Sequence, residues 1–139
     1  MLLALQADAQ LAIGKPEAAL ASAAAGLKAV EKVGGAPLEA ELHRLRGAAL
    51  LAGAGTVSEA ETAMQQAIDA ARRQNAMSWE LRGAMSLARL RRQQGRRAEA
   101  RDLLAPVYGW FTEGFDTADL KEAKTLLDKL TEPAIAAEG

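Results

Sequence analysis

A pattern of small residues recurs three times along the chain, counted from Gly14, Gly55 and Gly95. The intervals are 41 and 40 residues, a period that is typical of stacked helical hairpins and not of a single-core enzyme. An alanine stands seven residues before each glycine and another stands five residues after it, namely Ala7, Ala48 and Ala88, then Ala19, Ala60 and Ala100. The repeat predicts an all-α array in which small side chains let neighbouring helices approach closely.

The residues that stand 5, 9 and 13 positions after each glycine are largely apolar, and these offsets share one helical face. Each glycine is therefore followed by a helix with an apolar stripe. The composition agrees, since 33 alanines and 20 leucines stand against only seven valines and isoleucines together, a balance that favours helix over strand. We therefore expect a right-handed solenoid of three helical hairpins closed by a C-terminal capping helix, all within one repeat domain.

The expected boundaries follow from glycines, prolines and capping residues. The domain covers 1–131, with hairpins at about 1–35, 36–75 and 76–113, a cap helix at about 116–130 and a flexible tail at 132–139. Thr56 and Glu59 fit a capping box at the start of one helix, and Asp116 can cap the last one.

Several kinds of chemistry are disfavoured. The chain has no cysteine and one histidine, His43, so it offers no thiolate, no pair of histidine ligands and no triad. The glycines of the Gly53–Thr56 segment are not followed by the lysine of a phosphate-binding loop. We expect no catalytic residue, no cofactor and no metal. Because the sequence shows no cysteine, no signal segment and no long apolar run, we expect a cytoplasmic location and no membrane insertion.

The charge of the chain is unevenly distributed. Residues 72–101 carry nine arginines against two glutamates, whereas the segments before and after them are acidic. This basic band, Arg72–Arg101, is the strongest candidate for contact with an anionic partner.

Three arginines of the band, Arg82, Arg89 and Arg92, share one side of a helix because they are spaced by 7 and 3 residues. Guanidinium groups bind carboxylates and phosphates through paired hydrogen bonds. The favoured partner is a protein or peptide with an acidic segment. Nucleic acid bound by the whole band is the alternative, although stacking aromatics are not interleaved with the arginines. The row could also be a solvated face, or could pair with Glu80 and Glu99.

The aromatic residues gather near the C-terminal end, apart from Trp79. One interpretation is that they pack the third hairpin against the cap helix. The other is an exposed docking patch, for which the candidates are Trp110, Phe111 and Phe115.

Two copies of a Gly-x-x-x-Glu-Ala turn, Gly55–Ala60 and Gly95–Ala100, together with the small residue seven positions before each glycine, resemble the tetratricopeptide repeat family. The period exceeds the usual ~34 residues of that family. It is similar to the longer repeats of large bacterial signal-transduction ATPases. The resemblance implies that Arg82, Arg89 and Arg92 face the concave side of the array.

The region from about residue 38 to residue 130 resembles the extreme C-terminal region of certain bacterial proteins, which join an adenylate/guanylate cyclase or DNA-binding domain to an AAA-type ATPase. The similar positions are most frequent from Glu59 onward. In those proteins the catalytic parts lie upstream. The resemblance implies a non-catalytic protein-interaction scaffold in signal transduction, the tail or remnant of a larger protein. Because no repeat precedes the first helix, we also expect self-association through the N-terminal hairpin.

Overall fold

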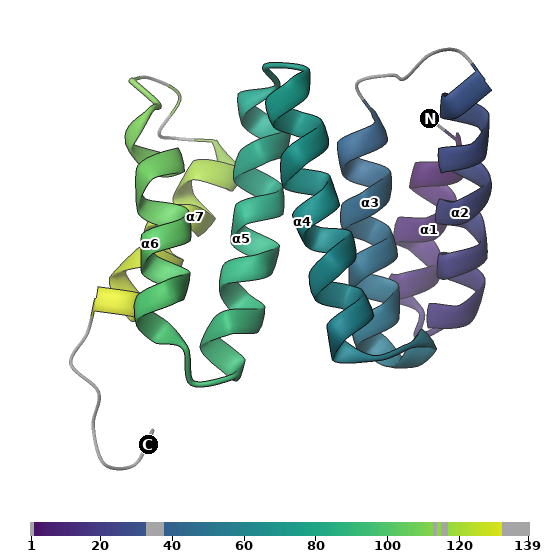
Figure 1. Cartoon of the computed structure of the whole chain (residues 1–139), viewed down its shortest axis with the longest axis horizontal. Coiled ribbons are helices and arrows are strands. Elements are labelled where there is room, and N and C mark those ends of the chain that lie inside the picture. The colour runs from purple at the N-terminus through teal and green to yellow at the C-terminus, as the bar shows by residue number, and fades with distance from the viewer. Residues whose placement is uncertain (1, 33–37, 113, 115–116, 132–139) are drawn as a thin grey trace.

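The computed structural model describes residues 2–32, 38–112, 114 and 117–131, and these form α-helices joined by short turns, without a strand (Figure 1). The helices are α1 (Leu2–Ala12), α2 (Pro16–Lys32), α3 (Leu38–Ala49), α4 (Val57–Arg73), α5 (Met77–Gln93), α6 (Arg97–Gly109) and α7 (Ala118–Thr131), and a wider π-type turn, η1 (Leu50–Ala54), follows α3. The all-α class predicted from the repeat is confirmed. Asp116, Phe115 and the 132–139 tail lie outside the described residues.

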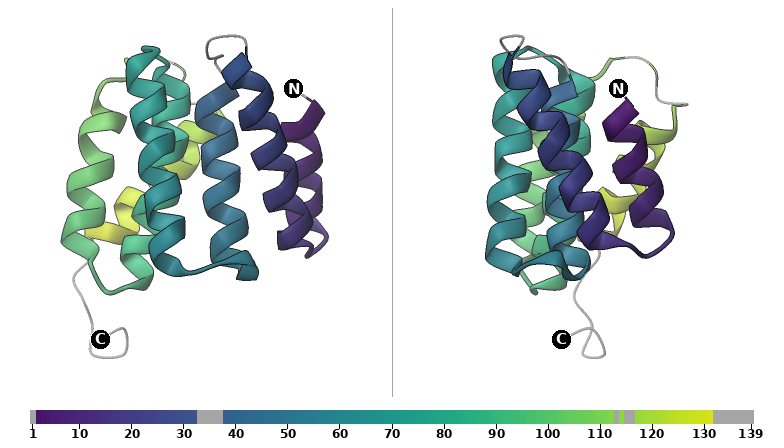
Figure 2. Two further views of the ribbon diagram at one scale, coloured as in Figure 1. Left: turned by 45° about the vertical axis from the view of Figure 1, so that its right-hand side comes forward. Right: turned by 90° about the vertical axis from the view of Figure 1, so that its right-hand side faces the viewer.

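Consecutive helices run antiparallel, and each packs mainly against its neighbours in sequence (Figure 1). In addition, α3 contacts α1 and α5, and α5 contacts α7. The end-on view shows that α1 and α7 lie on the same side of the array (Figure 2). The odd-numbered helices therefore form one side of the molecule. On this side α5 contacts both α3 and α7.

The core is a row of clusters that follow the order of the helices. Ala7, Ala23 and Leu42 belong to a cluster between α1, α2 and α3. At the other end, α5, α6 and α7 share a cluster that includes Leu81 and Leu104. Between the two, Met64 and Ile68 of α4 pack with Leu87 and Leu90 of α5. Each of these three clusters joins helices that lie next to one another, so apolar surface is buried along the whole row.

The alanine register is confirmed at most positions. Ala19, Ala60 and Ala100, which follow the glycines by five residues, are fully buried. Ala7 and Ala88, seven residues before a glycine, are fully buried as well. The middle repeat departs from the pattern, because Ala48 is half-buried and its neighbour Ala49 takes the fully buried place.

The turn after α3 explains this shift. Gly14 and Gly95 have left-handed backbones, with φ of 77° and 76°, as expected of a glycine that ends a helix. Gly55 has an extended φ of −167°, and the left-handed residue is Gly53, with φ 133°. This helix therefore ends differently from α1 and α5, because η1 widens its last turn. Gly55 is instead confined by space, since a Cβ there would meet the Leu50 side chain and the Glu59 carboxylate.

Capping contacts fix the starts of two helices. The Glu59 amide donates to Thr56 Oγ1 at 3.1 Å, and the Thr56 amide donates to the Glu59 carboxylate at 2.9 Å, which confirms the capping box. These hydrogen bonds lower the pKa of Glu59. At α7 the Leu120 amide donates to Thr117 Oγ1 at 3.5 Å, so Thr117 provides a cap next to the expected Asp116.

Two glycines allow α3 and α5 to approach α4. A Cβ on Gly47 would lie 2.9 Å from Met64 Cγ and 3.2 Å from the Ala60 carbonyl oxygen. A Cβ on Gly83 would lie 3.0 Å from Ile68 Cγ1. Contacts this short leave no room for a side chain, so α4 is held closely on both sides.

The buried alanines yield a test of the packing. Replacing Ala88 by leucine should lower the free energy of unfolding by about 1–3 kcal/mol, because the larger side chain overpacks a filled contact with α6. Thermal and denaturant unfolding measure the change. The matched control is Ala98→Leu, at an exposed position on α6, which should leave stability within about 0.5 kcal/mol of the parent. Equal stability of the two variants would contradict the observed packing.

Candidate functional site

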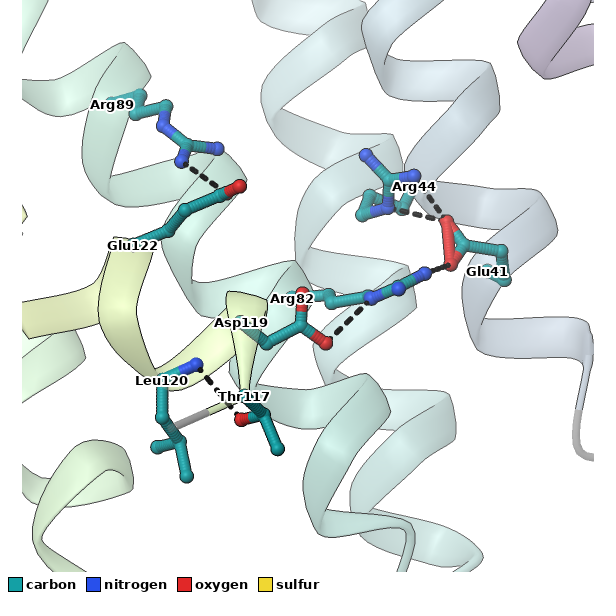
Figure 3. Close-up of polar contacts among 8 residues, drawn as sticks. All are labelled: Glu41, Arg44, Arg82, Arg89, Thr117, Asp119, Leu120 and Glu122. Carbon is teal, nitrogen blue, oxygen red and sulfur yellow. Dashed lines mark hydrogen bonds and ion pairs between the residues drawn. The ribbon is translucent and has the colours of Figure 1, made fainter. Parts of the chain in front are cut away.

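Helix α5 carries all three arginines of the predicted row, and they lie in different surroundings. The helix begins after Asn75, whose φ of 53° reverses the chain at the end of α4. Leucines and alanines on two faces of α5 are buried against α4, α6 and α7. Arg82 and Arg89 are therefore left on the side shared with α3 and α7 (Figure 3), and Arg92 lines a hollow with residues of α7.

Arg82 is the centre of an ion-pair network that joins three helices. Its NH1 group donates to Glu41 Oε2 of α3 at 2.8 Å, and its Nε group donates to Asp119 Oδ2 of α7 at 3.0 Å (Figure 3). The Glu41 carboxylate is only 6 % exposed and also pairs with Arg44. The guanidinium carbon of Arg82 lies 5.3 Å from the Trp79 ring centroid, within cation–π range.

The pKa of Arg82 reflects these contacts. Burial lowers it, but the hydrogen bonds to Asp119 and Glu41 and the negative charges of these two carboxylates together raise it by more, so the pKa lies above the ordinary arginine value. Arg82 is thus held charged by its internal partners. Its guanidinium is already engaged on two sides, and it contributes to the join between α3, α5 and α7.

Arg89 and Arg92 are more accessible. Arg89 pairs with Glu122 of α7 at 3.4 Å, and both side chains are about half exposed. An exposed pair of this length contributes little stability. Arg92 is exposed, and its side chain has no ion-pair or hydrogen-bond partner among the described residues. Both arginines can therefore accept a new anionic partner at small cost.

These two arginines line a hollow of about 390 Å³ between α5 and α7. Lys121 and Lys129 of α7 face it as well, and Glu122 is its one acidic lining residue among those described. Four cations against one carboxylate give this α5–α7 hollow a positive potential, which attracts carboxylates or phosphates.

The two predicted acidic partners of the row lie elsewhere. Glu80 pairs with Arg72 at 2.8 Å, and Glu99 pairs with Arg96, the residue before α6. Of the nine arginines in the Arg72–Arg101 band, at least six pair with glutamate or aspartate side chains, namely Arg72, Arg73, Arg82, Arg89, Arg91 and Arg96. The band is therefore largely neutralised, and its arginines are distributed over α4, α5, α6 and the turn between α5 and α6.

The aromatic candidates also separate. Tyr108 and Phe111 pack, half-buried, against the α5–α6–α7 cluster, as the first interpretation predicts. Trp110 is 48 % exposed and stays available for docking. Phe115 lies outside the described residues. Trp79 packs in a different cluster, with Ala40 of α3 and Ala70 and Ala71 of α4.

A further hollow lies between α2, α3 and α4, and its lining includes Glu39, His43 and Arg73. His43 Nδ1 is buried and has no hydrogen-bond partner among the residues that the structure describes. Burial lowers the pKa of His43, Glu39 raises it, and Arg46 and Arg73 lower it further, with a lower pKa as the net result. Within the described residues no cluster of three or more histidine, aspartate or glutamate side chains could hold a metal ion.

None of the described helices is long and apolar enough to cross a lipid bilayer. Comparisons of the chain with protein-family models, with curated proteins and with solved structures gave no match. The resemblance to tetratricopeptide repeats and to signalling ATPases therefore stays an expectation drawn from the residues, and the case for function depends on the geometry around α5.

The Arg82 network can be tested by its removal. Arg82→Gln leaves the buried Glu41 carboxylate with one partner fewer, so the free energy of unfolding should fall by about 1–3 kcal/mol. A double-mutant cycle with Asp119→Asn should give a coupling energy of at least about 0.5 kcal/mol. Arg101→Gln, at an exposed arginine of α6, is the control and should have no measurable effect. Additive effects at positions 82 and 119 would count against a joined network.

The lowered pKa of His43 predicts a dependence of stability on pH. The unfolded chain takes up the proton at a higher pH than the folded chain, so stability is fully present above the ordinary pKa of about 6.5 and falls as the pH decreases. The free energy of unfolding should decrease between about pH 7 and pH 5.5, before most carboxylates titrate. In His43→Gln this slope should flatten. Parallel curves for parent and variant would show that His43 is not responsible.

Proposed function

We propose that this chain is a non-catalytic protein-interaction scaffold that binds an acidic segment of a protein partner in the α5–α7 hollow. The observation that carries the proposal is the set of four cations at this hollow, of which Arg92 has no partner among the described residues. The scaffold itself is proposed to be a right-handed, tetratricopeptide-like solenoid of three hairpins, with α7 as its capping helix.

The contacts of α7 support a carboxylate as the ligand. Its own Asp119 and Glu122, one turn apart, pair with Arg82 and Arg89. This side of α5 thus already binds acidic side chains presented by a helix. Arg92 and Lys129 continue the same side beyond the reach of those two carboxylates, and an external acidic segment would supply the missing negative charge there.

A role in signal transduction is proposed from the resemblance to the C-terminal regions of bacterial cyclase and regulator proteins. The acidic segment would then belong to another domain or subunit of the same assembly, in the cytoplasm. Self-association through the N-terminal hairpin is proposed as well, because Leu5 and Ile13 on or next to α1 are 61 % and 66 % exposed. Light scattering at high micromolar concentration measures it.

Nucleic acid is the less favoured partner. Binding to a phosphate backbone needs many cations along one path, whereas most of the band is engaged with acidic side chains within the chain. A gel shift with random duplex at low salt distinguishes this alternative.

The test of the proposal is a titration with a fluorescent glutamate-rich peptide at low salt. Arg92→Glu/Lys129→Glu should weaken binding about tenfold or more, because two attractive charges become repulsive. Binding by the parent should also weaken as the salt concentration rises from about 0.05 M to about 0.5 M.

The control variant is Arg101→Glu/Lys15→Glu, which makes the same change in net charge at exposed positions away from the hollow. If both double variants lose affinity equally, the attraction is general and the site is not the α5–α7 hollow. Loss of binding in neither variant would move the interaction to another surface, with exposed Trp110 as the next candidate.

A further inference from the structure

A second hollow adjoins the α5–α7 hollow and has a different chemistry. This second hollow, the α3–α5 hollow, lies between the end of α3, η1 and the C-terminal half of α5. Its volume is about 520 Å³. Its apolar lining consists of Ala48, Leu51, Ala52, Met64 and Leu90. No acidic side chain is among its described lining residues, and Arg44 and Arg89 are its cations.

Arg89 and Gln93 line both hollows. The two residues are one turn apart on α5, so their side chains form a short ridge with a basic hollow on one side and an apolar hollow on the other. Figure 1 shows the arrangement of the helices that makes this possible, since α5 lies between α3 and α4 on one side and α6 and α7 on the other.

We infer that the acidic segment bound at the α5–α7 hollow crosses this ridge and places an apolar side chain in the α3–α5 hollow. The inference rests on the proposed function and specifies its partner, a protein segment in which a leucine-like residue accompanies the carboxylates. Charge complementarity orients the segment, because its acidic end faces Arg92 and Lys129 and its apolar residue faces Leu51 and Ala52.

The spacing within the segment follows from helix dimensions. Hollows on the two sides of one helix are separated by about one interhelical distance, about 8–10 Å. An extended chain covers that distance in roughly three residues at about 3.3 Å each. The apolar residue should therefore stand about three positions from the nearest carboxylate.

Three peptides of equal length and charge test the inference by fluorescence anisotropy at low salt. The first has a glutamate cluster and only glycine and serine elsewhere. The second has one leucine three positions from the cluster. The third has the leucine ten positions away. The second peptide should bind the parent about tenfold more tightly than the other two, because only it buries the leucine.

The matched variant is Ala52→Gln, which puts a neutral polar side chain at an exposed position of the apolar hollow. It should abolish the advantage of the second peptide and leave the affinity of the first unchanged. Ala98→Gln, exposed on α6, is the control and should preserve the advantage.

Equal affinity of the parent for all three peptides would overturn the apolar subsite and leave the proposed function standing. An undiminished advantage in Ala52→Gln would overturn the assignment of the subsite to this hollow. Absence of binding by every peptide, or equal binding of a fourth peptide with serine in place of glutamate, would overturn the proposed function itself, and the inference with it.

Discussion

The close packing of α3 and α5 against α4 is the contact on which the rest of the structure depends. Gly47 and Gly83 lie where any Cβ would meet Met64 or Ile68 of α4, and Ala60 at the same contact is fully buried. Small residues thus hold three helices at short distance. Because α3 and α5 both pack closely against α4, their facing sides come close enough for Glu41 of α3 to reach Arg82 of α5.

The Arg82 network then transfers that arrangement to α7. A carboxylate as buried as Glu41 is costly without partners, and the two arginines that satisfy it come from α3 itself and from α5. The second hydrogen bond of Arg82 draws Asp119 and the start of α7 to the same place. The position of α7 is therefore linked to the contact between Glu41 of α3 and Arg82 of α5. The same holds for Lys121 and Lys129, which α7 carries.

The sequence predicted the helices well because the information that specifies them is local. Glycine at the ends of α1 and α5, the Thr56–Glu59 capping box and the alanine register all act within one or two turns. The departures were local as well, but depended on geometry that the pattern does not encode. Gly53 and Gly55 are both small, and only the widened turn of η1 decides which of them is left-handed. Asn75 could have been recognised, since asparagine tolerates that backbone at a helix end.

The candidate site was less predictable for a physical reason. Arg82, Arg89 and Arg92 share a helix side by spacing alone, but their availability depends on which acidic residues pair with them from 33 or more positions away. Helical periodicity contains no information about such distant pairing. It could not show that Asp119 takes Arg82 and leaves Arg92 open, nor that lysines of an acidic C-terminal segment would complete a basic hollow.

Helix α7 has two roles that follow from its amphipathic sequence. Its buried face, with Leu120, Ala123 and Leu130, attaches it to α5 and α6, and this apolar burial supplies the stability that exposed ion pairs cannot. The polar side chains are thereby free to shape the surface. Asp119 and Glu122 neutralise the N-terminal part of the arginine row, whereas Lys121 and Lys129 reinforce its C-terminal part. The positive potential is consequently concentrated at one end of α5, beside the apolar hollow, and not spread along the helix.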